Sequence, residues 1–184
     1  MLRPRPGDFN YSLSELTVLQ RDLDVAAKAG ADGVVFGVLE GPENRIAVAA
    51  LRTLVQAATA FGLGTTFHRA FDAVPDRANA LETLIDCGVD RVLTAGITWG
   101  RSGSALDGLD TLDDLVRRAD GRIEITIGGR VQASNATTIL SRLAPRGGRI
   151  GIHAYSGVLV KGVTSLARVR ELVSTVADAS RPVA

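Results

Sequence analysis

Residues 29–39, Ala-Gly-Ala-Asp-Gly-Val-Val-Phe-Gly-Val-Leu, join the end of an amphipathic segment to a short run of apolar β-formers. Residues 87–94, Cys-Gly-Val-Asp-Arg-Val-Leu-Thr, repeat this junction. The glycine in each supplies the left-handed turn that ends a helix and leads into a strand. Single strands that alternate with single helices are typical of a parallel sheet with right-handed crossovers. The repeated junction therefore predicts a chain built from related β/α units.

The same alternation runs through the rest of the chain. Apolar runs predict strands at 34–39, 65–67, 91–94, 123–127 and 149–152. Amphipathic stretches predict helices near 13–29, 45–61, 76–87, 105–119, 132–143 and 163–179. Ser12 and Glu15 have the spacing of a capping box at the start of the first helix.

The size of the repeat indicates the fold class. With one strand at the very start, the chain holds about six units of roughly 30 residues, the unit size of a (β/α)₈ barrel. We predict an α/β fold of the TIM (β/α)₈ type, truncated to about six β/α units, as a single domain over residues 1–184. The alternative is a doubly wound open sheet, whose Gly-x-Gly-x-x-Gly phosphate loop is missing after the first strand.

Composition excludes several classes of protein. A net charge of +1 over 184 residues argues against nucleic-acid binding, which needs basic stripes. One cysteine, Cys87, excludes an intrachain disulfide framework and a multi-thiolate metal cage. There is no apolar run of membrane-spanning length and no apolar signal peptide at the amino end. We expect a cytoplasmic protein that forms a homo-oligomer and has no nucleic-acid or membrane partner.

Both histidines of the chain follow predicted strands. His68 comes directly after 65–67, and His153 comes directly after 149–152. Parallel α/β folds bind ligands at the carboxyl ends of their strands, so both side chains are candidate functional groups. The alternative is a neutral histidine that caps a strand end through hydrogen bonds.

Two groups of arginine and carboxylate lie near predicted strand ends. Arg69 and Asp72 follow His68, and Arg3, Arg5 and Asp8 lie at the start of the chain. An arginine fork suits an anionic ligand, and a carboxylate can orient an imidazole or bind a metal. The alternative for Arg69 and Asp72 is a salt bridge that pins the loop.

Glycines follow several strands. Gly128 and Gly129 come after 123–127 and offer backbone amides to a phosphate or carboxylate, although a plain tight turn is the alternative. Gly37 and Gly96 are expected to shape the mouth of the site. Cys87 lies where a helix leads into a strand, so we expect a small buried apolar residue there.

In order along the chain, these segments resemble the CutC family. The resemblance covers Arg3 to about Ser156 and rests on Arg3-Pro4-Arg5-x-Gly7-Asp8-Phe9-x-Tyr11-Ser12, Gly33-Val34-Val35-Phe36-Gly37-Val38-Leu39, Thr66-Phe67-His68-Arg69-Ala70-Phe71-Asp72, Gly88-Val89-Asp90-Arg91-Val92-Leu93-Thr94 and Ser104-Ala105-Leu106-x-Gly108-Leu109. The family is described as TIM-barrel proteins of copper homeostasis. The resemblance implies that the Arg-Pro-Arg segment follows the third barrel strand, so that about two β/α units of the family would precede Met1.

The chain also departs from the family pattern. This chain has Thr94-Ala95-Gly96 where the family has Thr-Ser-Gly. It has His153-Ala154-Tyr155-Ser156 where the family has His-Ser-Ser. Arg130 occupies a position where the family usually has glycine. Residues 99–103 look like an insertion in the loop before Ser104.

The resemblance implies copper as a ligand. Cu(I) prefers thiolate and thioether sulfur, and the chain offers only Cys87 and Met1. The resemblance implies that the cysteines proposed for copper in the family lie in the units that would precede Met1. His68 and His153 are then the candidate metal ligands, with Asp72 and Asp8 as oxygen ligands or partners of ligands, a set better suited to Cu(II) or Zn(II).

Three functions follow from these residues. The first is a copper homeostasis protein that binds copper ions. The alternative is an enzyme that acts on a small anionic or phosphorylated metabolite, with His68 and Asp72 as acid and base. In that alternative the anion-binding residues are Arg3, Arg5, Arg69, Gly128 and Gly129. The third is a non-catalytic subunit whose exposed strand edge is buried in a partner.

Overall fold

The computed structural model describes residues 1–144 and 148–179. The chain divides into two compact units, Met1–Leu93 and Thr94–Ala184. The assignment of residues 1–184 to a single domain stays a prediction. Within the described ranges, no helix has the length and apolar character needed to cross a membrane.

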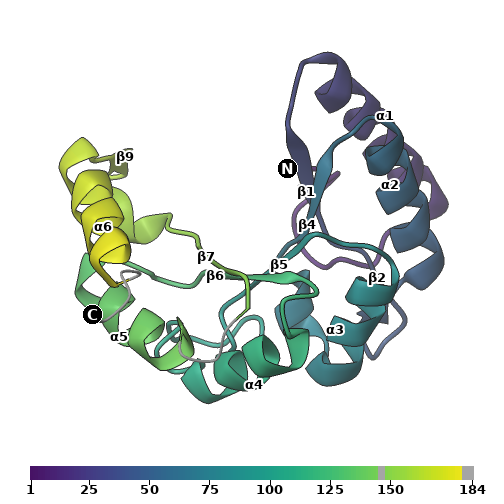
Figure 1. The fold of residues 1–184 in the computed structure, drawn as a ribbon. Coiled ribbons are helices and arrows are strands. Elements are labelled where there is room, and N and C mark those ends of the chain that lie inside the picture. The colour runs from purple at the N-terminus through teal and green to yellow at the C-terminus, as the bar shows by residue number, and fades with distance from the viewer. Residues whose placement is uncertain (145–147, 180–184) are drawn as a thin grey trace. The chain divides into compact units, whose positions relative to one another are not determined.

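The first unit alternates helices with parallel strands (Figure 1). Its elements are α1 (Leu13–Lys28), β1 (Gly33–Phe36), β2 (Leu39–Glu40), β3 (Arg45–Ile46), α2 (Val48–Ala60), β4 (Gly64–Phe67), the 3₁₀ helix η1 (Arg69–Ala73), α3 (Arg77–Asp86) and β5 (Arg91–Thr94), whose last residue belongs to the second unit. β1 pairs with β4 in parallel from Gly33–Gly64 to Phe36–Phe67. β4 pairs in turn with β5, where Thr66 lies opposite Arg91.

The core of the first unit lies between its strands and helices. Along β1 and β4 every second side chain is buried, which places Phe36 and Phe67 in the core. Leu19 and Leu23 of α1 are fully buried, as their spacing predicts, and α1 packs against α2 and β1. The capping box is also confirmed: the Glu15 N–H donates to Ser12 Oγ, and the Ser12 N–H donates to Glu15 Oε2.

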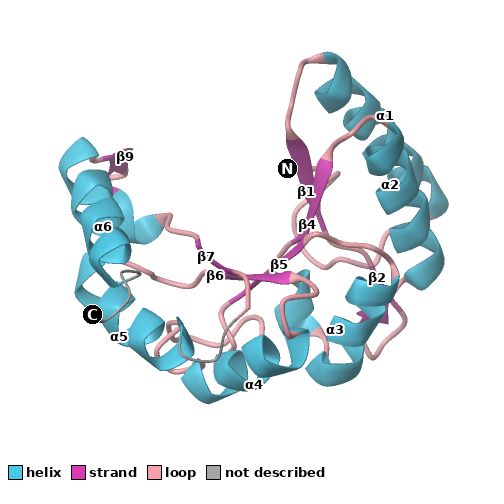
Figure 2. Ribbon diagram, in the orientation of Figure 1, coloured by secondary structure: helices cyan, strands magenta, loops and turns pink. Residues whose placement is uncertain are grey.

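The second unit continues the same alternation, as the colours of Figure 2 show. Its elements are α4 (Leu109–Ala119), β6 (Glu124–Ile127), α5 (Ala133–Leu143), β7 (Ile150–Ile152), the 3₁₀ helix η3 (Ser156–Val158), β8 (Leu159–Val160), β9 (Val163–Thr164) and α6 (Leu166–Ala179). The Thr94 carbonyl of β5 accepts a hydrogen bond from the Gly128 N–H, and β6 pairs with β7 in parallel. The strand order is therefore β1-β4-β5-β6-β7.

The structure confirms the predicted parallel α/β class. In the described part of the chain, β1 and β7 end the strand order, and no closed barrel is present. At the start of the chain, where a first strand was predicted, the Leu2 N–H donates to the Val35 carbonyl at 2.7 Å, but no regular strand is formed.

Two short hairpins correct the predicted boundaries. The strand predicted over 34–39 ends at Phe36, and the helix predicted from 45 begins at Val48, because β2 and β3 pair as an antiparallel hairpin. The helix predicted from 163 begins at Leu166, because β9 pairs with β8. A strand of two residues is too short to show a hydrophobic periodicity. The sequence therefore predicted these residues as part of the longer strand or helix next to them.

Candidate functional site

His68 follows β4 directly and lies in the core of the first unit. Its N–H donates to the Phe36 carbonyl at 2.7 Å, which extends the β1–β4 ladder by one bond. Only 5% of its surface is exposed. The ring centroid lies 5.1 Å from that of Phe9 and 6.2 Å from that of Phe67. The imidazole is therefore enclosed by aromatic rings at the carboxyl end of a strand, where the sequence predicts a site.

The hydrogen bonds of His68 show which ring nitrogen carries the proton. Nδ1 accepts from the Ala70 N–H at 3.1 Å, so this nitrogen carries no proton and the neutral ring is protonated on Nε2. Nε2 is buried and has no hydrogen-bond partner among the described residues. Burial lowers the pKa of His68 to about 4, and the positive charge of Arg3 acts in the same direction. At neutral pH, His68 is thus an uncharged hydrogen-bond donor.

Asp72 lies in η1, immediately after His68. It is fully buried, and its Oδ2 accepts from Arg69 Nε at 2.7 Å. Its carbonyl accepts from Arg77 Nη2 at 3.2 Å. The ion pair considered as an alternative is thus present, and it holds the turn that follows β4. A ligand role for Arg69 or Asp72 stays a prediction.

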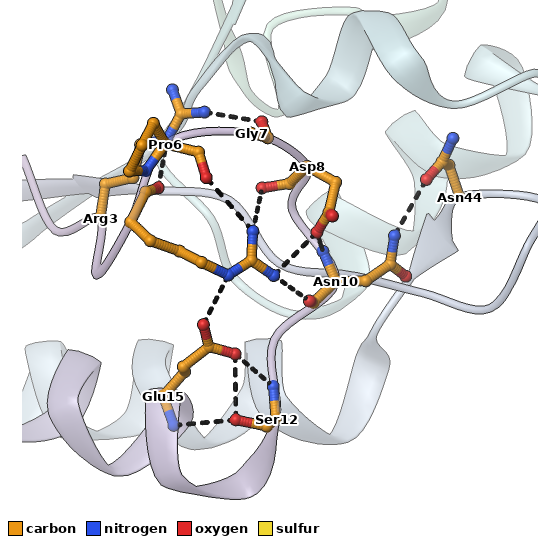
Figure 3. Close-up of polar contacts among 9 residues, drawn as sticks. Arg3, Pro6, Gly7, Asp8, Asn10, Ser12, Glu15 and Asn44 are labelled. Atoms are coloured by element: carbon orange, nitrogen blue, oxygen red, sulfur yellow. Dashed lines mark hydrogen bonds and ion pairs between the residues drawn. The ribbon is translucent and has the colours of Figure 1, made fainter.

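Arg5 organises the loop of residues 3–12, which we call the arginine loop. Figure 3 shows Arg3, Asp8 and Asn10 of this loop together with Glu15 of α1. The Arg5 guanidinium contacts Glu15 Oε1 at 2.5 Å and Asp8 Oδ1 at 2.9 Å, and it donates to the Asn10 carbonyl at 2.8 Å. The Arg5 hydrogen bond is the main cause that lowers the pKa of Asp8. Arg5 and Asp8 are therefore partners of each other, and their predicted anion and metal roles remain predictions.

Arg3 connects the arginine loop to His68. It donates to the Gly7 carbonyl at 2.9 Å and to the Arg5 carbonyl at 3.1 Å. Its guanidinium carbon lies 4.9 Å from the centre of the Phe9 ring, within the range of a cation–π contact. Phe9 also contacts the His68 ring, so it lies against both a positive charge and the buried imidazole.

The second unit holds the remaining predicted residues. The Gly128 N–H belongs to the strand ladder, and the Gly129 carbonyl accepts from the Ala105 N–H at 2.9 Å. Gly129 has a φ of +95°, as a tight turn requires. His153 is exposed, and its N–H donates to the Ile127 carbonyl at 2.9 Å. The anion and metal roles of these three residues remain predictions.

The predicted site residues divide between the units: Arg3, Arg5, Asp8, His68, Arg69 and Asp72 lie in the first, and Gly128, Gly129 and His153 in the second. Over residues 1–144 and 148–179, no three His, Cys, Asp or Glu side chains gather in a group that could hold a metal ion. Cys87, expected to be buried, is only half-buried as the C-cap of α3.

Sequence reasoning placed His68 at a strand end but missed its partners. Phe9, Gly37 and Ala70 surround the ring, yet Phe9 and Ala70 were not singled out and Gly37 was expected only to shape the mouth. No periodic signal links residues 9 and 68, because their contact depends on tertiary structure. The short distance from His68 to Ala70 along the chain was the one signal that could have revealed the Nδ1 hydrogen bond.

Comparison with known proteins supports the resemblance. A model of the CutC family matches residues 1–157. A family protein CutC of Vibrio campbellii is 43% identical over 142 residues, which are 77% of this chain and 56% of the relative. Its counterpart in Xanthomonas campestris is 42% identical over 139 residues, which are 76% of this chain and 55% of the relative. The chain thus spans about half the length of these curated relatives.

Solved structures agree with the fold. A CutC protein of Streptococcus agalactiae, provisionally named as a copper homeostasis protein, superposes with a TM-score of 0.71 at 31% identity, over 81% of this chain and 70% of the other. The ribulose-1,5-bisphosphate carboxylase/oxygenase of Pyrococcus horikoshii reaches a TM-score of 0.59 at 15% identity, over 89% of this chain and 39% of the other. The second likeness shows the fold alone.

Proposed function

This chain belongs to the CutC family, and from that premise we propose that its first unit binds a small anionic ligand at the end of β4. The observation that carries the proposal is Nε2 of His68, a buried donor without a partner among the described residues. A buried donor left unpaired costs about 1–3 kcal/mol, which an oxygen acceptor of a ligand would offset. Arg3 supplies positive charge on the Phe9 ring that covers His68.

The hydrogen bonds of His68 suit an oxygen acceptor better than a metal ion. A metal binds the lone pair of an unprotonated ring nitrogen. The Ala70 N–H occupies the lone pair of Nδ1, and Nε2 then carries the proton. Cu(I) also prefers sulfur ligands, but Cys87 lies before the start of β5 whereas His68 follows the end of β4. The residues around His68 therefore do not fit copper.

The proposal gives His68 a binding role. A general acid or base works best when its pKa lies near the operating pH. The pKa of His68, about 4, leaves the ring neutral under physiological conditions. Asp72, the predicted partner in acid–base chemistry, is held by Arg69. In this proposal His68 donates a hydrogen bond from Nε2–H to the ligand. It does not transfer a proton at neutral pH.

Copper homeostasis is the second candidate function. The likeness to the S. agalactiae CutC protein, which carries that name, favours it. This chain spans about half the length of its curated relatives, so a role in copper homeostasis is a proposal for it. The same proposal includes copper ion binding, a cytoplasmic location and self-association. In this proposal copper is the cargo, and His153 in the second unit is the remaining predicted histidine ligand.

Nuclear magnetic resonance of the ¹⁵N-labelled chain tests the first proposal. We expect the ring nitrogens of His68 to report the Nε2–H tautomer, and titration with inorganic phosphate or acetate to shift Nε2 in a saturable manner. Arg3→Gln should weaken that shift, whereas Arg45→Gln, which removes an exposed arginine paired with Glu43, should not. An Nδ1–H tautomer, or an Nε2 signal that neither anion moves, would overturn the proposal.

Copper binding is tested separately. The chain is titrated anaerobically with Cu(I) in competition with a chromophoric chelator, alongside His68→Ala and His153→Ala. If the His68→Ala variant still competes with the chelator for Cu(I) and the His153→Ala variant does not, copper is bound as cargo at a site away from His68. Competition lost only in His68→Ala would contradict the proton assignment made above. No competition in any form of the chain would overturn copper binding by these residues and leave the anion proposal intact.

A further inference from the structure

A groove of about 620 Å³ lies in the first unit, between the β2–β3 hairpin and α3. β3 packs against α3, and Figure 2 shows the hairpin beside this helix. The volume is in the range of pockets that bind small molecules. All of the lining residues lie between Glu40 and Thr83, and the lining includes none of the residues that surround His68. The groove is therefore separate from the ligand site proposed at His68.

One face of α3 forms a wall of this groove. The lining residues that this helix and its N-cap contribute are Asp76, Asn79, Ala80 and Thr83. Their spacing of three or four residues places them on the same side of the helix. All four side chains are short, so the helix leaves space beside the hairpin instead of filling it.

The floor of the groove is apolar. Ile46 of β3, Val74 and Ala80 line it and are almost fully buried, with 6%, 5% and 3% of their surfaces exposed. Val48 at the start of α2 also lines the groove and is more exposed. The hydrophobic effect favours the burial of aliphatic groups against such a surface. The floor therefore suits the alkyl part of a ligand.

The rim of the groove carries more negative than positive charge. It holds the carboxylates of Glu40, Glu43 and Asp76 and one cation, Arg45. Arg45 Nη1 lies 3.8 Å from Glu43 Oε2, so this cation is already paired. Among residues 1–144 and 148–179, the Glu40 carboxylate has no ion-pair or hydrogen-bond partner. Two carboxylates thus face the groove without a cation.

Asp76 offers one free oxygen to a ligand. Its Oδ1 accepts from the Asn79 N–H at 3.0 Å and so caps α3, whereas Oδ2 has no partner in the part of the chain that the structure describes. Carboxylate oxygens form their strongest hydrogen bonds with charged donors. An ammonium group carries one positive charge and three donors, so it complements Asp76 and Glu40 together.

We propose that this groove binds a small aliphatic amine, with its ammonium group at Glu40 and Asp76 and its alkyl chain on the apolar floor. Aliphatic amines are protonated at neutral pH, as the lysine side chain is. The proposed ligand has the opposite charge to the one proposed at His68, and neither proposal depends on the other.

The test is a titration of the full chain at low ionic strength and constant pH with butylamine, methylamine and butanol. Methylamine has the charge without the alkyl chain, and butanol has the alkyl chain without the charge. The amide signals of Ile46, Val74 and Thr83 follow binding in the groove. We expect butylamine to bind saturably, and methylamine and butanol to bind at least about fivefold more weakly. Added salt should weaken the binding of butylamine.

Variants of the rim test the role of its charges. Glu40→Gln and Asp76→Asn should each weaken butylamine binding by at least about fivefold, and asparagine preserves the helix cap. Asp86→Asn is the matched control, because it removes the same charge from the last residue of α3, outside the lining, and should change binding by less than about twofold. Arg45→Gln removes the only cation of the lining and should tighten binding.

Thr83→Leu tests the groove itself. Leucine favours the helix and extends into the space beside the hairpin, so this variant should fold and should weaken the binding of butylamine more than that of methylamine. The proposal is overturned if butylamine gives no saturable shift at millimolar concentration, or if butanol or methylamine binds as tightly. It is also overturned if Asp86→Asn weakens binding as much as Glu40→Gln, since the amine would then respond only to the overall charge of the chain.

Discussion

Gly37 lies against the imidazole of His68. A β-carbon built on Gly37 would lie 2.4 Å from both Cε1 and Nδ1 of the ring, and 2.8 Å from the β-carbon of Ala70. Gly37 follows β1, and His68 follows the neighbouring strand β4. The absence of a side chain at residue 37 therefore makes the space in which the histidine is buried, next to the Ala70 N–H that fixes its proton.

Gly37→Ala should displace the ring. We expect a loss of about 2–3 kcal/mol in the free energy of unfolding, at the upper end of the cost of overpacking a core, measured by urea denaturation. The pKa of His68 should rise towards its ordinary value as the ring becomes hydrated. In a His68→Ala background the same substitution should cost less, because only the contact with Ala70 remains. An undiminished cost in that background would contradict the steric explanation.

The stability of the chain should depend on the protonation of His68. Its pKa is about 4 in the folded state and about 6.5 when unfolded, so the unfolded state takes up the proton first as the pH falls. The free energy of unfolding should lose about 3 kcal/mol from this group between neutral pH and pH 4, with the full contribution present above pH 6.5.

His68→Gln isolates this effect from the titration of carboxylates. The difference in unfolding free energy between the unsubstituted chain and His68→Gln should shift by that amount across the same pH range, in urea titrations at matched ionic strength. A difference that does not change with pH would show that the histidine is protonated equally in both states.

Arg5 should control the titration of Asp8 more than that of Glu15. The Arg5 hydrogen bond is the largest cause that lowers the pKa of Asp8, whereas the backbone and side-chain hydrogen bonds of Ser12 contribute most at Glu15. In Arg5→Gln we expect the pKa of Asp8 to rise towards its usual value and that of Glu15 to rise less, in carboxyl NMR titrations. Arg45→Gln should leave the pKa values of Asp8 and Glu15 unchanged. If the pKa of Asp8 does not change in Arg5→Gln, the pairing of Asp8 with Arg5 is refuted.

Asp90 should stabilise the start of β4. Its Oδ2 accepts from the N–H of Thr65 at 2.7 Å and from Thr65 Oγ1 at 2.9 Å, and Thr65 is only 1% exposed. Asp90→Ala leaves both donors unpaired and should cost about 2 kcal/mol in thermal or urea unfolding. Asp90→Asn keeps one acceptor and should cost about half as much. Asp86→Ala, at an exposed position of α3, should change stability by less than about 0.5 kcal/mol.

The regular elements follow from local sequence to a large extent. The spacing of Leu19 and Leu23 and the Ser12–Glu15 capping box are encoded within one or two helical turns, so the position of α1 was predictable. The hairpins β2–β3 and β8–β9 were not, because strands of two residues gain their stability only from pairing with each other.

The candidate site shows the same division. Sequence alone indicated that His68 follows a strand, that Arg69 and Asp72 accompany it, and that the chain resembles the CutC family. The departures from that family at Arg130 and residues 99–103 stay predictions. Sequence alone could not determine the state of the His68 proton or the engagement of Arg5 with Glu15.

Those features depend on atoms that folding brings together. The space for the ring comes from Gly37, the cover comes from Phe9, and the hydrogen bond that leaves Nε2 as a donor comes from the Ala70 amide. The sequence thus determined which chemical groups stand at the ends of the strands. The tertiary structure decided which of them are paired and which buried donor has no partner among the described residues, because hydrogen bonds and burial depend on distances that only the folded chain sets.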